Sequence, residues 1–232
     1  MIEFTNVSKR YVMKKALDNV SFTLSAGKII GIVGENGSGK STILKLMAGL
    51  LQPTQGNITI NGEQVTRHIC QSVSYLSELD AYYPFYTVKE HVLFYESQFY
   101  DFNKEKADEI LAFMNVDQNV KVKHLSKGNR GRVKIALALA RKVPLILMDE
   151  PFSGLDPMAR EAIVKGLLSF VDLETQTIIM TTHEIKEIES ILDVVVLIKD
   201  GNILKIQDVE EIKFEHNMGI VEWMKEMYGT FA

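Results

Sequence analysis

The chain has 232 residues, of which 46% are hydrophobic and 24% are charged, and its formal net charge is −4 at pH 7. This length is sufficient for one large domain or two small ones, and the composition is that of a globular protein with a substantial core. The negative net charge argues against broad electrostatic attraction to nucleic acid, so we expect no nucleic-acid partner.

A single cysteine, Cys70, excludes an internal disulfide and a zinc site built from cysteines. This usage suits a reducing compartment such as the cytoplasm. No window approaches the ~18 consecutive apolar residues that span a bilayer. The first residues lack the apolar stretch of a signal peptide. We therefore expect a soluble chain that reaches a membrane only through a partner.

The first part of the chain predicts strands on both sides of a glycine-rich loop. Short strands are expected at residues 2–7 and 20–24, and residues 28–33 form an apolar run typical of a buried strand. After the loop, apolar residues recur at helical spacing over residues 43–51. A turn then leads into an alternating strand at residues 57–61.

The second part predicts a helical insertion followed by a parallel sheet. From about Thr87 to Arg141 the chain is rich in helix formers and nearly free of Gly and Pro. Strands are expected at residues 145–148 and 177–181, with a helix near residues 160–171 between them. This order predicts a right-handed crossover and parallel strands. A hairpin over residues 194–206 and a C-terminal helix follow. Within the helical insertion, one helix is expected from Asn129 to Lys142. The C-terminal helix carries an apolar stripe at helical spacing, which favours core packing over a partner contact: Ile220, Trp223, Met224, Met227, Tyr228 and Phe231.

The glycine-rich loop predicts polyphosphate binding. Residues 34–42, Gly-Glu-Asn-Gly-Ser-Gly-Lys-Ser-Thr, satisfy the pattern G-x-x-x-x-G-K-[ST] between an apolar strand and an amphipathic helix. Glycines let several backbone N–H groups converge on phosphate, and the helix N-terminus adds a positive dipole end. Lys40 is expected on the β and γ phosphates, and the Ser41 hydroxyl on Mg²⁺. The expected nucleotide-binding residues here are Gly34, Asn36, Gly37, Ser38, Gly39, Lys40, Ser41 and Thr42.

Two carboxylates and a histidine follow neighbouring strands further along. Asp149 and Glu150 end the strand at residues 145–148, and His183 ends the next strand. Asp149 is expected to hold Mg²⁺, and Glu150 to polarise the attacking water. His183 lies where it can bond a γ-phosphate and sense its presence. Without the phosphate loop, each of these residues is equally well explained as an ordinary surface or core residue.

These motifs resemble the ATP-binding subunits of ABC transporters over nearly the whole chain. Residues 125–129, Leu-Ser-Lys-Gly-Asn, are similar to the signature motif of that family, and residues 153–156 to its D-loop. The resemblance implies that Tyr11 stacks on adenine and that Ser126, Gly128 and Asp156 contribute to a shared ATP site. It also implies a head-to-tail dimer, in which each ATP lies between the phosphate loop of one subunit and the signature motif of the other.

The resemblance implies an α/β P-loop NTPase fold. Its core is a mainly parallel sheet, with an antiparallel N-terminal β-subdomain and an inserted α-helical subdomain. We expect a single domain over residues 1–232. Residues 1–80 and 142–210 would form the ATP-binding core, residues 81–141 the helical subdomain, and residues 211–232 a C-terminal helix.

The chain departs from the family pattern at two places. In the signature, Lys127 stands where glycine is usual and Asn129 where glutamine is usual. Lys-Gly at this place is similar to ABC-2 type exporters, including bacitracin-resistance and antimicrobial-peptide exporters. The chain also resembles an ATPase of the phenol-soluble modulin exporter. Glu78 stands where the family has a glutamine. We hypothesise that Glu78 still reaches Mg²⁺ and that hydrolysis is tuned rather than abolished. The alternative is that Glu78 is a solvated loop acid.

The resemblance implies ATP and Mg²⁺ as ligands, and integral-membrane permease subunits as partners at the cytoplasmic face of the membrane. The dimer would be a homodimer or a heterodimer with a second ATP-binding subunit. The aromatic residues near Pro84 fit either docking to the permease or packing of the subdomain. Export of peptides, antimicrobial compounds or lipid-like molecules is the expected function. The alternatives are a soluble ABC-type ATPase and a regulatory ATP-binding module.

Overall fold

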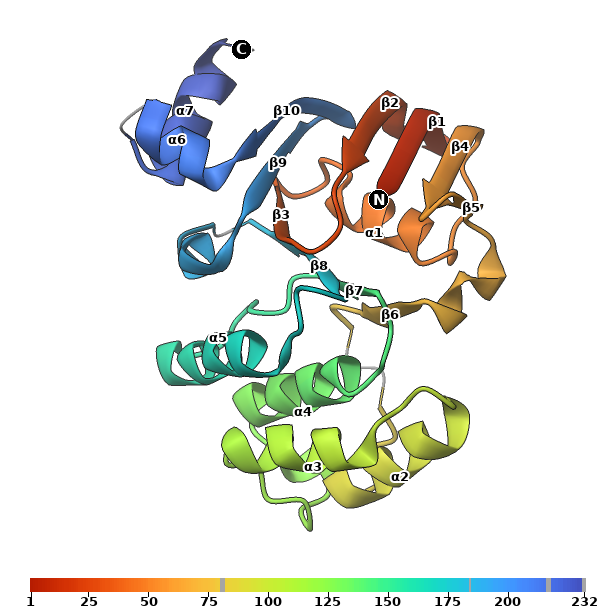
Figure 1. Cartoon of the computed structure of the whole chain (residues 1–232), viewed down its shortest axis with the longest axis vertical. Helices are drawn as coiled ribbons and strands as arrows, with labels where there is room; N and C mark the ends of the chain where they lie inside the picture. The colour runs from red at the N-terminus through yellow and green to blue at the C-terminus, as the bar shows by residue number, and fades with distance from the viewer. Residues whose placement is uncertain (80–81, 184, 216–217, 231–232) are drawn as a thin grey trace.

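The structure consists of two sheets with helices packed around them (Figure 1). It is a computed structural model that describes residues 1–79, 82–183, 185–215 and 218–230. The strands are β1 (Ile2–Tyr11), β2 (Lys14–Leu24), β3 (Ile29–Val33), β4 (Gln55–Ile60), β5 (Glu63–Gln64), β6 (Val73–Leu76), β7 (Leu145–Met148), β8 (Thr177–Thr182), β9 (Val194–Lys199) and β10 (Asn202–Asp208). The α-helices are α1 (Lys40–Met47), α2 (Val88–Gln98), α3 (Lys104–Phe113), α4 (Lys127–Leu139), α5 (Pro157–Phe170), α6 (Val209–Glu215) and α7 (Ile220–Thr230). Short 3-10 helices cover Arg67–Gln71, Val122–His124, Ile185–Glu187 and Glu189–Ile191.

The first sheet is antiparallel, with the strand order β2-β1-β4-β5, as the sequence predicts for the N-terminal part. β1 and β2 are longer than expected, because the link between them continues their pairing as far as Tyr11 opposite Lys14. Only Val12 and Met13 are left to make the turn. Tyr11 and Lys14 therefore stand together at the end of a hairpin.

The second sheet is mainly parallel, with the order β10-β9-β3-β8-β7-β6. β3 pairs in parallel with β8 and β9, β7 pairs in parallel with β6 and β8, and β10 adds an antiparallel edge. Every residue of β3, β7 and β8 is buried, which explains their continuous apolar character. Because these strands run in one direction, the segments after β3, β6, β7 and β8 meet at one edge of the sheet. The α/β fold predicted from the sequence is confirmed.

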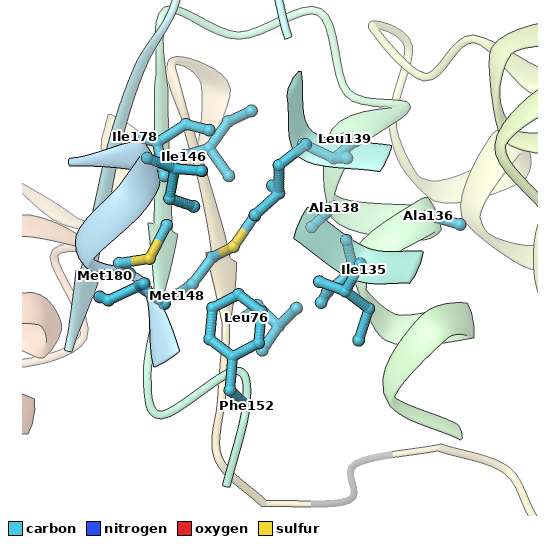
Figure 2. Close-up of a cluster of buried hydrophobic side chains, with 14 of the residues drawn as sticks. Leu76, Ile135, Ala136, Ala138, Leu139, Ile146, Met148, Phe152, Ile178 and Met180 are labelled. Carbon is cyan, nitrogen blue, oxygen red and sulfur yellow. The ribbon is translucent and has the colours of Figure 1, made fainter. Parts of the chain in front are cut away.

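Helix α4 packs against this sheet and connects the helical layer to it. Figure 2 shows Ile135 and Leu139 of α4 facing Ile146 and Met148 of β7, with Phe152 beside them. α2 and α3 pack on the other side of α4, away from the sheet (Figure 1). These helices lie within residues 81–141, where the helical insertion is expected; the subdivision of the chain at its exact limits stays a prediction.

The signature segment belongs to α4 itself, and the expected start of this helix at Asn129 is wrong. α4 begins at Lys127, because the Ser126 Oγ accepts a hydrogen bond from the Asn129 N–H at 3.2 Å and caps the helix. Gly128 lies in the first turn, where a Cβ would come within 3.0 Å of the Ala159 Cβ on α5. Glycine at this position therefore lets α4 and α5 approach closely.

The C-terminal part forms two helices, α6 and α7, where one helix over residues 211–232 is expected. Ile220 and Trp223 of α7 are buried in the main core, so the apolar stripe of this helix packs inward. Phe231, the last member of the predicted stripe, lies outside the described residues. None of the helices that the structure describes combines the length and apolar character that crossing a bilayer requires.

Arg141, just after α4, joins the helical layer to the core. Its Nε lies 2.7 Å from the Asp101 Oδ2, and both side chains are buried. The guanidinium also donates to the Cys70 backbone oxygen at 2.9 Å and lies 3.9 Å from the centre of the Phe99 ring. Arg141 thus connects the α2–α3 loop to the segment that precedes β6.

Replacing Arg141 by alanine is expected to lower the free energy of unfolding by about 3–5 kcal/mol, because the Asp101 carboxylate would stay buried without its cation. Urea denaturation of the purified chain measures this change. The matched control is Lys165→Ala, which removes an exposed pair with Glu161 on α5 and should leave the free energy of unfolding nearly unchanged. Equal losses in the two variants would contradict this account.

Candidate nucleotide site

A cavity of about 470 Å³ opens at the sheet edge where β3, β6, β7 and β8 end. It brings together residues from the β1–β2 hairpin, the phosphate loop and the segments after β6, β7 and β8. Its lining comprises Tyr11, Lys14, Ala16, Asn36, Gly37, Gly39, Lys40, Ser41, Thr42, Glu78, Glu150, Ser153 and His183. Gly34 and Ser38 belong to the same loop but lie outside this lining, and the Ser38 side chain is buried.

The phosphate loop has the backbone that its glycines permit. Gly39 has φ 114°, a conformation that side chains disfavour, and it precedes the first turn of α1. Gly34 has no room for a side chain, because a Cβ there would lie 2.3 Å from the Ile198 backbone oxygen of β9. The loop is therefore pressed against the sheet on one side and open to the cavity on the other.

Lys40 is held inside the loop. Its Nζ donates to the backbone oxygens of Gly34 at 2.7 Å and Glu35 at 3.1 Å, and it lies 3.7 Å from the Glu150 Oε1. Burial lowers the pKa of Lys40, and the Glu150 carboxylate opposes this shift. An anion that enters the cavity could therefore bind the Lys40 ammonium without a large movement of this side chain.

Asp149 lies beneath the cavity and is 2% exposed. Its Oδ1 accepts hydrogen bonds from the Ser41 and Thr181 hydroxyls, each at 2.8 Å, and its Oδ2 accepts one from the Tyr75 hydroxyl at 3.2 Å. Burial and the charge of Asp149 raise the pKa of Tyr75, so its hydroxyl remains a donor at neutral pH.

The oxygens at this point fit a magnesium ion bound together with a nucleotide. The described residues include no cluster of three or more His, Cys, Asp or Glu side chains that would hold a metal alone. Mg²⁺ typically takes only one or two protein oxygens and completes its shell with phosphate and water. The Ser41 hydroxyl and the Asp149 carboxylate, 2.8 Å apart, are oxygen donors of this kind.

Glu150 is fixed at the rim of the cavity in a strained conformation. Its φ of 48° is rare for a residue with a long side chain and costs of order 1–3 kcal/mol. The Thr181 Oγ1 accepts from the Glu150 N–H at 2.9 Å, and the His183 Nδ1 lies 2.9 Å from the Glu150 Oε2. One carboxylate thus stands between Lys40 and His183.

Ser126, Gly128 and Asp156, here called the signature group, lie together but do not line this cavity. Asp156 caps α5 by accepting from the Ala159 N–H at 2.9 Å. A Cβ on Gly128 would lie 3.3 Å from the Asp156 Oδ2. Within one chain, the phosphate loop and the signature group are therefore separate surfaces.

Glu78 is exposed and lines the cavity beside Lys40. It also lines a second cavity of about 340 Å³ that reaches Lys127 on α4. The Lys134 Nζ of α4 donates to the backbone oxygens of Glu78 and Leu79, each at 3.2 Å. The segment after β6 is thus tied to the helix that carries the signature.

Several residues of the site were not predicted as site residues, among them Tyr75, Thr181 and Lys14. Tyr75 looks like an ordinary strand residue, and Thr181 like the end of another strand. Lys14 looks like an exposed charge in the connection between β1 and β2. Its Nζ nevertheless lies beside the phosphate loop, 3.4 Å from the position that a Cβ on Gly37 would take. Strand register could have identified Tyr75 as a site residue. Tyr75 lies just before the end of β6, at the edge of the sheet where the site forms.

Comparison with known proteins agrees with this geometry. The family model described as "ABC transporter" matches residues 17–153. The chain is similar to "Nod factor export ATP-binding protein I" of Burkholderia orbicola (34% identity, 86% of this chain and 68% of the relative). It is also similar to "Bacitracin transport ATP-binding protein BcrA" of Bacillus licheniformis (31% identity, 93% and 71%). A third relative is "Probable sulfate/thiosulfate import ATP-binding protein CysA" of Chlorella vulgaris (33% identity, 89% and 91%).

Solved structures give the same picture. "Structure of ATP binding subunit of ABC transporter" matches with a TM-score of 0.85 at 25% identity, covering 98% of this chain and 99% of the other. "Dimeric structure of a post-hydrolysis state of the ATP-binding cassette MJ0796 bound to ADP and Pi" matches with a TM-score of 0.79 at 27% identity, covering 90% and 98%. The two sheets and the helical layer are thus a known arrangement.

Proposed function

The chain belongs to the ABC transporter family as an ATP-binding subunit that hydrolyses ATP, and from this premise we propose that it powers export. Two of the three relatives compared above carry names for export or for bacitracin transport, and one carries a name for import. Lys127 in the signature also favours the ABC-2 exporter type. The proposed cargo is a peptide, an antimicrobial compound or a lipid-like molecule.

The observation that carries the proposed chemistry is the position of Glu150 between Lys40 and His183 at the cavity rim. Glu150 acts as the general base toward the attacking water, because its carboxylate is fixed by its neighbours. His183 bonds the γ-phosphate, and Lys40 bonds the β and γ phosphates. Tyr11, at the hairpin end, stacks on the adenine.

The remaining loop residues bind phosphate. Backbone N–H groups of the loop converge on the α and β phosphates, and the first turn of α1 adds its dipole. The proposed phosphate-binding residues are Gly34, Asn36, Gly37, Ser38, Gly39, Lys40, Ser41 and Thr42. Mg²⁺, held by Ser41 and Asp149 with Glu78 nearby, supplies a positive charge that neutralises the phosphate oxygens when it is bound.

A single chain holds only half of the proposed site. The signature group lies outside the cavity, so a second subunit must bring its own copy of Ser126, Gly128 and Asp156 to the γ-phosphate. A related cassette was solved as a dimer with ADP and Pi. We propose a head-to-tail dimer in which the second subunit is an identical chain or another ATP-binding subunit.

A groove on α2 and the segment that precedes it suits a membrane partner. It has a volume of about 590 Å³ and is lined by Tyr82, Tyr83, His91, Phe94, Tyr95, Gln98 and Phe99, here called the aromatic groove. Tyr83 and Phe85 at its edge are 46% and 59% exposed. Exposed aromatic side chains of this kind are typical of protein interfaces. We propose that a permease subunit docks here, which would place the chain at the cytoplasmic face of the membrane.

His91 sets the shape of this groove. It is 2% exposed, its Nε2 accepts a hydrogen bond from the Tyr83 N–H at 3.0 Å, and its Nδ1 lies 3.3 Å from the Thr87 backbone oxygen. Burial lowers the pKa of His91, which keeps the ring neutral and able to accept. Tyr83 is therefore held in place by its backbone, while its ring remains available to a partner.

Two other functions remain as alternatives to transport. A soluble ABC-type ATPase would leave the aromatic groove without a membrane partner. A regulatory ATP-binding module would bind ATP without turnover, and the geometry around Glu150 opposes it. The following experiments separate these functions.

Replacing Glu150 by glutamine is expected to lower the ATPase rate at least about 100-fold, because the amide cannot accept a proton from water. ATP binding is expected to remain, since Lys40 and the loop backbone are unchanged. A phosphate-release assay and an ATP-binding titration on the same preparations measure the two effects. A wild-type chain that binds ATP but shows no ATPase activity would favour the regulatory module.

Replacing Glu78 by glutamine is expected to change both the ATPase rate and the Mg²⁺ concentration needed for half-maximal rate, each by about 2- to 10-fold. The physical reason is that one negative charge leaves the cavity beside Lys40. The matched control is Glu63→Gln, an exposed acid on β5. An unchanged rate and an unchanged Mg²⁺ dependence in Glu78→Gln would show that Glu78 is a solvated loop acid.

Replacing Tyr83 and Tyr86 together by alanine is expected to abolish co-purification with a co-expressed permease subunit, because two interface aromatics are lost. The ATPase rate of the isolated subunit is expected to stay within about twofold of wild type. The control is Tyr100→Ala, since Tyr100 is exposed outside the groove. Retained co-purification of the double variant would argue against docking at this groove.

A further inference from the structure

The side of the phosphate loop that faces away from the cavity rests on the β9–β10 hairpin. The Gly201 N–H donates to the Ser38 backbone oxygen at 2.9 Å, and Gly34 is in close contact with Ile198. A Cβ on Gly39 would also lie 3.2 Å from the Ile198 Cδ1. The position of the loop therefore depends on what holds this hairpin against it.

Tyr228 of α7 joins the loop to β9 at this junction. Its hydroxyl donates to the Ile198 backbone oxygen at 3.3 Å. Tyr228 also lines a cavity of about 210 Å³ together with Glu35, Asn36, Gly37 and Ser38 of the loop. Burial and the nearby charges of Glu35 and Asp200 raise the pKa of Tyr228, so the hydroxyl stays protonated and able to donate. One side chain thus links the C-terminal helix, a strand of the main sheet and the phosphate loop.

The helix that presents Tyr228 is itself anchored. Trp223 is 1% exposed and Ile220 is fully buried, and the Ile220 N–H donates to the Glu189 Oε1 at 3.0 Å. The Lys199 Nζ lies 5.9 Å from the centre of the Tyr228 ring. In Figure 1, α7 lies beside α6 and β10, at the opposite end of the molecule from α2 and α3. Tyr228 is therefore held by a packed helix and not by a loose tail.

We propose that Tyr228 is a positioning residue for the phosphate loop, through which the docking of α7 sets the affinity for nucleotide. Ile198 contacts the loop at Gly34 and Gly39, so holding the Ile198 backbone holds the surface against which the loop rests. The hydroxyl does not line the nucleotide cavity and touches no reacting atom. It acts on binding and leaves the chemical step unchanged. The proposal rests on the ATP site proposed at residues 34–42.

Replacing Tyr228 by phenylalanine tests this role, because it keeps the ring packed and removes the hydroxyl with its hydrogen bond to Ile198. The Kd for Mg-ADP, measured by isothermal titration calorimetry on the full chain, is expected to rise about 3- to 10-fold. The KM for ATP is expected to rise by a similar factor, while kcat stays within about twofold of wild type.

The matched control is Tyr100→Phe, which makes the same chemical change at a side chain that is 85% exposed, and it should leave Kd and KM unchanged. An unchanged Kd and KM in Tyr228→Phe, or a lower kcat at constant KM, would overturn the inference while leaving the nucleotide site intact. A wild-type chain that bound no Mg-ADP would overturn the nucleotide site itself, and the inference with it.

Discussion

The site depends on one buried carboxylate. Asp149 accepts hydrogen bonds from three hydroxyl groups: Ser41 of α1, Thr181 of β8 and Tyr75 of β6. A buried carboxylate costs several kcal/mol unless such partners satisfy it. The three hydroxyls therefore stabilise Asp149 and at the same time fix the first turn of α1 against the edge of the sheet. The phosphate loop, Glu150 and His183 take their positions from that edge.

The sequence predicts most of the fold because its signals are local. Buried strands appear as apolar runs, and the parallel order follows from the helices between them. The expected start of α4 at Asn129 lies two residues too late, because the Ser126 hydroxyl caps the helix and lets it begin at Lys127. Tyr75 and Tyr228 were seen only as packing residues, because their roles come from hydrogen bonds to distant segments.

The described state is organised for nucleotide but lacks part of the catalytic arrangement. Lys40 bonds the loop backbone, and Glu150 is held between Lys40 and His183. The signature group, which includes Asp156 of the D-loop, lies on another surface of the same chain. Lys134 connects α4, which carries the signature, to the backbone of Glu78 and Leu79, so a movement of the helical layer would reach the segment after β6.

The central claim is that ATP is bound by two subunits, with the phosphate loop of one facing the signature group of the other. Sedimentation velocity of the Glu150→Gln variant with and without Mg-ATP tests it most directly, because slow hydrolysis preserves the complex. If the chain pairs with itself, we expect a monomer without nucleotide and a dimer with Mg-ATP. If it pairs with another ATP-binding subunit, we expect the same change from monomer to dimer once that subunit is added. A chain that stayed monomeric in both mixtures at saturating Mg-ATP, with an ATPase rate per subunit independent of concentration, would contradict it.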